Sequence, residues 1–373
     1  MTVTVKDSVR NLAPYQNGSH TETILDNHKK ILKLDSNEAT IPPSPKVLMA
    51  LSRHIYEGPL NWYPDVESSK LRRKLSSYTS LPEECILTFN GSDHALKTIT
   101  RAYLSKGDEV ILFQPTYDHF RLNVEAADAT VVGVRENQDL ALKDKVLQGA
   151  SPKTKIVYLV NPNNPTGRLT PIEEIREALA LFPHILFIVD EAYYEFSKIT
   201  AAPLVREFPN VIVSRSFSKA FGLAALRCGY LLATPEICAQ VGKIRIGKNI
   251  NALAQVAGCV ALDDLEYMEH FVEEVNQMKS WLIDNFQSMG LETKTTPANY
   301  ILVKVAEPEK VMEFLSGQNI YIRDRSKLQD LEGYLRLTVG DQFSMKRFWR
   351  VFTQVPKAYL VNGASKAAET HIS

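Results

Sequence analysis

The chain has 373 residues, 45% of them hydrophobic, with 43 basic and 43 acidic side chains. A chain of that length is expected to form two domains with a sizeable core. Because the formal charges balance, neither nucleic acid nor an anionic membrane is expected as a partner. No apolar run reaches the roughly 18 residues of a membrane span, and the first residues lack the apolar core of a signal peptide, so a cytoplasmic protein is expected.

Residues 1–40 are polar and turn-rich, which predicts an N-terminal arm that joins a smaller domain. Short β-branched or apolar runs then alternate with helical patterns, which predicts a large α/β domain over residues 41–250 with a mostly parallel sheet between helices. Helices are expected at 92–104, capped by Ser92, and at 171–182, where Pro171 follows the cap Thr170. The expected strands are 85–89, 109–113, 130–134, 155–160, 186–189, 211–214 and 229–232.

Residues 251–360 predict a smaller α+β domain, and the polar residues 361–373 are expected to be disordered. In the smaller domain we expect helices at 252–263, 267–289 and 344–355, and strands at 300–305, 320–323 and 334–339. The four cysteines form no Cys-x-x-Cys pair, which favours buried, reduced thiols over disulfides or a metal site. They are Cys85, Cys228, Cys238 and Cys259.

The first of three segments suited to catalysis is Asn161-Pro162-Asn163-Asn164-Pro165-Thr166-Gly167, directly after a predicted buried strand. Its prolines and glycine cannot continue a strand or a helix. In a sheet of this kind, ligands bind at the loops that follow the carboxyl ends of the strands. A plain turn is the alternative explanation.

The second segment is Asp190-Glu191-Ala192-Tyr193, which follows the apolar run 186–189. An acid at the tip of a buried strand is costly unless it meets a donor or a cation, such as a protonated pyridine nitrogen. An acid that caps a neighbouring helix is the alternative.

The third segment begins at Ser216-Phe217-Ser218-Lys219 and continues to Arg227. A lysine flanked by hydroxyls, with an arginine further on, suits a Schiff base beside a phosphate group, with the same amine later carrying a proton. Arg227, Ser216 and Ser218 would then bind phosphate oxygens. A surface lysine is the commoner explanation for Lys219 alone, but the three segments together are more specific than any one of them.

These segments resemble those of the fold-type I aminotransferases that depend on pyridoxal 5′-phosphate (PLP), and among them the histidinol-phosphate aminotransferase-like branch. The resemblance implies the PLP-dependent transferase fold with a seven-stranded-type sheet, PLP as cofactor, an amino-acid substrate and a homodimer with shared active sites. Further matching motifs are Leu12-Ala13-Pro14-Tyr15, Trp62-Tyr63-Pro64-Asp65, Gly91-Ser92-Asp93, Pro115-Thr116-Tyr117, Ile322-Arg323-Asp324 and Leu335-Arg336-Leu337-Thr338-Val339-Gly340.

The resemblance also implies a role for each matched residue. Lys219 would hold PLP, Asp190 would pair with the pyridine N–H, Asn164 and Tyr193 would bind the 3′ oxygen, and Tyr117 would stack on the ring. The phosphate would be bound by Gly91, Ser92, Asp93, Ser216, Ser218 and Arg227, and by Tyr63 of the partner subunit. The substrate would be bound by Arg336 and Asn37 at its α-carboxylate, by Arg323 at its distal end, and by Tyr15.

The sequence departs from the family beside the substrate. The position after Asp93 is usually acidic and here is His94, and the usual Asn-Glu-Asn-Pro reads Asn37-Glu38-Ala39-Thr40. An imidazole can exchange protons near pH 7, although a histidine with a structural role on a helix is the alternative. Transamination is the favoured activity. Elimination or cyclodehydration, for example of a hydroxylated arginine to a cyclic guanidino amino acid, stays open, as does a catalytically silent PLP-binding protein.

Overall fold

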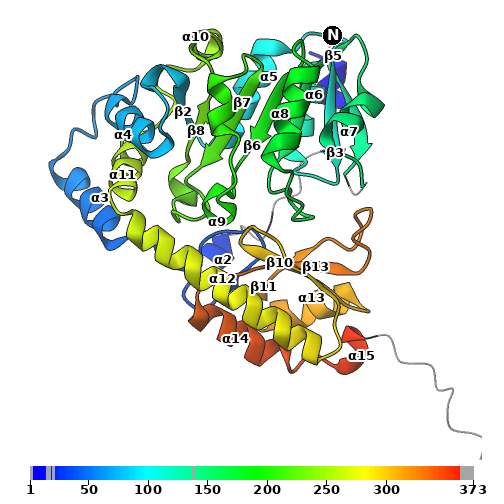
Figure 1. The fold of residues 1–373 in the computed structure, drawn as a ribbon. Helices are drawn as coiled ribbons and strands as arrows, with labels where there is room; N and C mark the ends of the chain where they lie inside the picture. Colours follow the sequence, from blue (N-terminus) through cyan, green and yellow to red (C-terminus); the bar gives the residue numbers. More distant parts are fainter. Residues whose placement is uncertain (1–2, 14–17, 19–21, 137–138, 362–373) are drawn as a thin grey trace, which may run out of the picture. The chain divides into compact units, whose positions relative to one another are not determined.

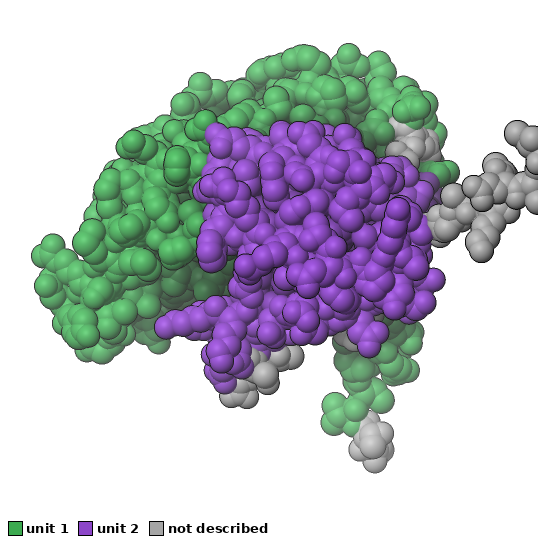
Figure 2. Space-filling model, turned by 90° about the horizontal axis from the view of Figure 1, so that it is seen from below, with its two compact units in different colours: residues 1–17, 38–273, 296–299 green, residues 18–37, 274–295, 300–373 purple. Residues whose placement is uncertain are grey.

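A computed structural model describes residues 3–13, 18, 22–136 and 139–361. The chain forms two compact units, which Figure 2 shows in separate colours. Unit 1 comprises Met1–Asn17, Glu38–Glu273 and Thr296–Asn299, and unit 2 comprises Gly18–Asn37, Glu274–Thr295 and Tyr300–Ser373. These ranges differ from the expected 1–40, 41–250 and 251–360, because the second boundary falls within α12 (Leu265–Ser288). The preceding helix, α11 (Ala252–Leu262), belongs to unit 1 because it packs on α3 (Pro45–Glu57) and α4 (Ser69–Thr79).

Unit 1 is built on a seven-stranded sheet with the order β2-β8-β7-β6-β5-β3-β4 (Figure 1). β8 runs antiparallel to β2 and β7, and the other neighbouring strands are parallel, which confirms the predicted mostly parallel sheet. The strands are β2 (Ile86–Asn90), β3 (Glu109–Gln114), β4 (Thr130–Arg135), β5 (Thr154–Val160), β6 (Leu186–Asp190), β7 (Val211–Ser216) and β8 (Cys228–Leu232).

Helices cover both faces of this sheet, so its central strands are apolar almost throughout. On one face α5 (Ser92–Tyr103), α6 (His119–Ala126) and α10 (Pro235–Ile244) share a hydrophobic core with strand residues such as Leu112 and Tyr158. The next residues along the strands, Phe113 and Leu159, point the other way and lie near α7 (Leu142–Gly149) and α8 (Ile172–Leu181). The remaining helices of unit 1 are α1 (Asp7–Arg10), α9 (Tyr194–Ser197), and the short 3-10 turns Glu83–Cys85, Ala202–Arg206 and Ala224–Leu226.

Two predicted helix caps were wrong by one residue. Gly91, not Ser92, is the N-cap of α5, and its φ of 80° is one that glycine adopts at little cost. Pro171 is the N-cap of α8 rather than its first helical residue. Thr170 stays outside that helix because its N–H and C=O are both hydrogen-bonded to the Asn161 side chain, at 2.8 and 3.0 Å.

Unit 2 contains a four-stranded antiparallel sheet, β12-β13-β10-β9, and a parallel pair, β1-β11. The predicted strand 320–323 is divided into two, because β11 pairs with β1 whereas β12 pairs with β13. The elements are β1 (Leu32–Lys33), β9 (Thr293–Lys294), β10 (Tyr300–Lys304), β11 (Ile320–Tyr321), β12 (Arg323–Asp324), β13 (Tyr334–Thr338), α2 (Glu22–Asp26), α13 (Pro308–Gly317), α14 (Gln342–Phe352) and α15 (Lys357–Leu360). Phe286 of α12 packs edge-on against Phe348 and Phe352 of α14.

Within the described ranges, no helix is both long and apolar enough to cross a lipid bilayer. The four cysteines are buried free thiols, as expected.

Candidate active site

The carboxyl edge of the seven-stranded sheet gathers the predicted site segments of unit 1. Strands β3, β5, β6 and β7 are parallel, so the loops that follow them lie at one edge. Because β8 is antiparallel to both β7 and β2, β2 also ends at this edge and β8 begins there. Backbone hydrogen bonds join the loops: the Asn161 N–H donates to the Asp190 carbonyl and the Glu191 N–H to the Ser214 carbonyl, both at 2.8 Å.

Two neighbouring acids at this edge have different surroundings. Glu191 is buried against Arg215, with its Oε2 3.0 Å from the Arg215 Nε. Asp190 is equally buried, but its oxygens accept only from the Tyr158 hydroxyl at 2.7 Å and the Ala192 N–H at 3.2 Å, and no ion pair reaches it from the described residues. Burial raises the pKa of Asp190 to about 6, since the charged form lacks a neighbouring cation. A protonated pyridine nitrogen would supply that cation.

A compact cradle forms where β2 ends and β8 begins. The Arg227 Nη2 lies 3.2 Å from the Asp93 Oδ2, and the Tyr117 hydroxyl donates to the other Asp93 oxygen at 3.0 Å. A Cβ added to Gly229 would lie 2.5 Å from the Ser92 nitrogen, and one added to Gly91 would lie 2.5 Å from the Arg227 Nη2. Glycine at position 229 therefore lets the start of β8 approach the backbone at the start of α5, and glycine at position 91 leaves room for the Arg227 guanidinium. The first turn of α5, with its free N–H groups, suits an anion such as a phosphate.

Lys219 follows β7 in a tight loop. The Ser218 N–H donates to the Ser216 Oγ at 3.1 Å, and the Gly222 N–H donates to the Lys219 carbonyl at 3.1 Å. The Ser218 Oγ is buried and has no hydrogen-bond partner among the described residues. Among the described residues, Asp190 thus has no cationic partner and the Ser218 hydroxyl has no hydrogen-bond partner. The pyridine N–H and the phosphate of PLP would supply these two partners, so the residues present fit this cofactor.

Asn164 and Tyr193 are both buried at the same edge, after β5 and β6. His94 lies in the first turn of α5, half-buried, with its ring edge-on to Phe89 at 5.7 Å. Burial lowers the pKa of His94, and the positive charges of Lys97, Arg101 and Arg245 lower it further, so the neutral ring is favoured at pH 7. These roles stay predictions.

Tyr63 is mostly exposed, and the Lys248 amine lies 3.6 Å from the centre of its ring. Tyr15 lies outside the described residues.

Unit 2 brings together the three other predicted substrate residues. Arg323 and Arg336 face each other across the β12–β13 pair. Arg336 is buried and donates to the Asp35 carbonyl at 2.6 Å. The Asn37 N–H donates to the Thr338 Oγ1 at 3.0 Å, and that hydroxyl donates to the Asn37 Oδ1 at 3.1 Å. Asn37 has a φ of 55°, so this bond pair holds it in the left-handed conformation.

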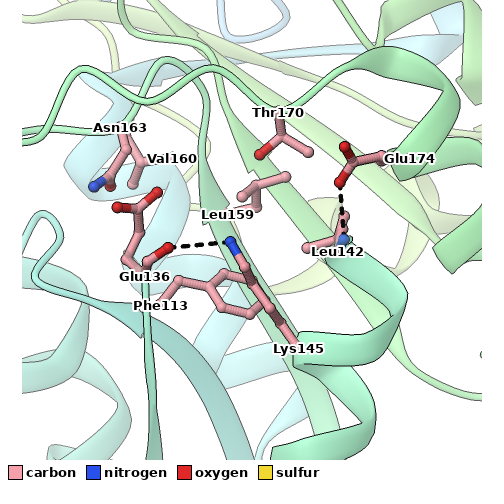
Figure 3. A pocket seen from close by; sticks show the side chains of 9 residues that line it. All are labelled: Phe113, Glu136, Leu142, Lys145, Leu159, Val160, Asn163, Thr170 and Glu174. Carbon is pink, nitrogen blue, oxygen red and sulfur yellow. Dashed lines mark hydrogen bonds between the residues drawn. The ribbon is translucent and has the colours of Figure 1, made fainter. Parts of the chain in front are cut away.

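A pocket beside the Asn163 loop is lined by one lysine, Lys145, and by two acids, Glu136 and Glu174 (Figure 3). The Lys145 amine points into it and donates to the Glu136 carbonyl at 3.1 Å, and burial lowers the pKa of this lysine. The Arg168 Nε lies 3.6 Å from the Glu136 carboxylate, and Glu174 accepts from the Leu142 N–H at 2.8 Å. The charged side chains at this pocket are thus already hydrogen-bonded or paired within the chain.

The sequence profile of the aminotransferase class I and II family matches residues 29–352, so the chain belongs to this family. It is therefore an enzyme of the PLP-dependent aminotransferase fold, and the predicted cofactor is confirmed on that ground. The chain is 33% identical over 345 residues to a dihydroxyacetone phosphate transaminase of Campylobacter jejuni, covering 91% of this chain and 93% of the relative.

Two further comparisons give the same family and fold. A histidinol-phosphate aminotransferase of Methanosarcina mazei is 34% identical over 358 residues, covering 93% of this chain and 95% of the relative. The crystal structure of histidinol-phosphate aminotransferase from Sinorhizobium meliloti in complex with pyridoxal-5′-phosphate has a TM-score of 0.83 at 24% identity, covering 96% of this chain and 98% of that one.

Sequence reasoning missed Tyr158 and Arg215, and it gave no role to Glu191 within the second segment. Tyr158 lies inside an apolar strand, where a tyrosine is typical of the core, and Arg215 lies between two predicted cofactor-binding segments with no pattern of its own. The contacts of Tyr158 and Arg215 follow from the pairing of adjacent strands. A single sequence does not show which residues of two strands lie opposite one another.

Proposed function

We propose that the chain is an aminotransferase that uses PLP to move the amino group of an amino-acid-like donor to a 2-oxo acid. The observation that carries this proposal is the contrast between Glu191, which has its arginine, and the equally buried Asp190, which has none among the described residues. Such an acid at the ligand-binding edge of the sheet is poised for a cation that comes from outside the chain.

Bound PLP would supply an electron-withdrawing ring that stabilises negative charge at the substrate α-carbon. Asp190 would keep a proton on the ring nitrogen, while Asn164 and Tyr193 would hold the 3′ oxygen and Tyr117 would cover the ring. The Lys219 Nζ would hold the cofactor and, once released, would take and return the α-proton. The α5 N-terminus, the two serines and Arg227 would bind the phosphate.

For the substrate, we propose that Arg336 and Arg323 of unit 2 bind anionic groups, with Asn37 beside them. Both of these relatives are named for a phosphorylated compound, dihydroxyacetone phosphate and histidinol phosphate. A donor that carries a phosphate or a second carboxylate therefore fits best, because paired guanidinium groups bind such anions in a bidentate way.

We further propose a homodimer in which the exposed ring of Tyr63 reaches the phosphate of the neighbouring site. Leu60 and Trp62 beside it are also exposed, and large apolar side chains that cluster on a surface are typical of an interface. Sedimentation of the holoenzyme would show two copies per particle if this is right, and Tyr63→Phe would weaken PLP binding.

The test of the activity is a panel of amino donors, each incubated with the holoenzyme with and without a 2-oxo acid. A transaminase converts the donor beyond a single turnover only when the acceptor is present, and the acceptor is aminated. Continued release of ammonia or of a cyclised product without any acceptor would instead establish the elimination or cyclodehydration alternative. Phosphorylated and plain versions of the same donor would test the anionic group.

A further inference from the structure

Tyr158 lies on β5, near its carboxyl end, and its hydroxyl donates to the Asp190 Oδ2 at 2.7 Å. In the parallel pair β5–β6, Tyr158 is opposite Ile188 and Val160 is opposite Asp190. All four side chains are on one face, so the phenol reaches diagonally to the acid. We propose that Tyr158 is a positioning residue that keeps Asp190 ionised and aimed at the pyridine nitrogen of the cofactor, an inference that rests on the proposed role of Asp190.

The orientation of the carboxylate is fixed from two sides. Its Oδ1 accepts from the Ala192 N–H and its Oδ2 accepts from Tyr158, so the plane of the group has little freedom. The Tyr158 ring is fully buried and stacks on Phe120 of α6, with ring centres 4.2 Å apart and planes 26° apart. The phenol cannot swing away without opening this core, and it therefore holds one oxygen of Asp190 in place.

The hydroxyl also influences where a proton resides. The acid and the ring nitrogen would share one proton, and a hydrogen bond donated to the carboxylate stabilises its charged form. Burial acts in the opposite direction on the Asp190 pKa, and the Tyr158 hydrogen bond offsets part of that effect. Loss of the hydroxyl would move the proton from the nitrogen toward the acid, and the ring would then withdraw electrons less strongly.

A tyrosine that merely needs a buried acceptor is the competing explanation. Tyr158→Phe separates the two, because it keeps the ring and its stacking and removes only the hydroxyl. The matched control is Tyr103→Phe. Tyr103 packs against the same core but is the last residue of α5, at the opposite end of that helix from Asp93. Asp190→Asn serves as the reference for full loss of the acid.

The measurement is the ¹⁵N chemical shift of the pyridine nitrogen in each holoenzyme reconstituted with ¹⁵N-labelled PLP, together with kcat and KM. We expect Tyr158→Phe to move the shift toward that of an unprotonated nitrogen and to lower kcat about tenfold with KM little changed, while Tyr103→Phe matches the wild type. A wild-type shift and kcat in Tyr158→Phe, with a clear change in Asp190→Asn, overturns this inference alone. A wild-type shift in Asp190→Asn overturns the proposed role of the acid as well.

Discussion

The Arg227 guanidinium lies 3.2 Å from the Asp93 carboxylate, and this contact joins the residue before β8 to the first turn of α5. Arg227 itself adopts a φ of 55°, a conformation that is uncommon for a residue with a side chain. The acid thus holds the guanidinium at the end of the helix where an anion is favoured. The pair defines the phosphate end of the proposed site.

Arg227→Gln should weaken PLP binding. A hydrogen bond to a charged group is worth roughly 1.5–3 kcal/mol, so the Kd for PLP should rise by about tenfold to a hundredfold. Titration of the apoprotein with PLP, followed by absorbance, measures this. Arg176→Gln, which removes an exposed arginine of α8, is the control and should bind PLP as the wild type does. Equal affinities for the Arg227 variant and the control would remove Arg227 from the phosphate site.

Asp190→Asn should retain PLP but lose most turnover. The amide cannot keep the ring nitrogen protonated, and the loss of one charged hydrogen bond should lower kcat by an order of magnitude or more. Steady-state kinetics of the fully loaded variant test this, with PLP content measured on the same sample. Kinetics close to those of the wild type would contradict the assignment of Asp190.

Glu191→Gln should destabilise the fold. Arg215 and Glu191 are both fully buried, and the change leaves the guanidinium without its nearest counter-charge. Breaking a buried ion pair from one side costs about 3 kcal/mol or more. Urea unfolding gives the value, and Glu173→Gln, whose exposed side chain pairs with Arg176 on the surface, should change stability by less than about 1 kcal/mol. Similar losses of unfolding free energy in the two variants would show that the buried ion pair stabilises the fold no more than the exposed one does.

Glu195 makes stability depend on pH in a defined direction. Burial raises its pKa to about 7, and one of its oxygens has no hydrogen-bond partner among the described residues. The folded state therefore holds a proton that the unfolded chain releases near its usual value, so this contribution is full at low pH and is lost as the pH rises through about 7.

Glu195→Gln removes that titration, because glutamine mimics the protonated acid at every pH. The free energy of unfolding of the variant, relative to that of the wild type, should therefore rise by roughly 3 kcal/mol from pH 5 to pH 8 for a pKa raised this far. Urea unfolding at the two pH values measures the difference. A gap between variant and wild type that stays constant with pH would show that Glu195 does not hold the proton.

The strands of unit 1 were predictable from the sequence because each is a short apolar run bounded by turn residues. The segments that contain Asp190 and Asn164 were singled out because each follows such a run, and the ends of parallel strands meet at one edge. Lys219 was singled out by its flanking hydroxyls and by Arg227, and the roles of all three residues stay predictions. Arg336 and Asn37 came only from the resemblance. Nothing in the sequence spacing shows that the segment of Asn37 pairs with that of Thr338, 301 positions further on.

Residues whose role depends on a neighbouring strand were not predictable. The Tyr158 contact with Asp190 requires the register of β5 against β6, and the Glu191–Arg215 pair requires that of β6 against β7. The cap of α5 was misassigned because a glycine with positive φ, rather than a serine side chain, precedes the helix.

The central claim is that Lys219 holds the cofactor, and it can be tested directly. Borohydride reduction of the PLP-loaded protein, followed by proteolysis and mass mapping, should find the pyridoxyl group on Lys219 and on no other lysine, and Lys219→Ala should carry no covalent label. A pyridoxyl group on a different lysine, or stoichiometric PLP binding that leaves Lys219 unlabelled, would contradict the account.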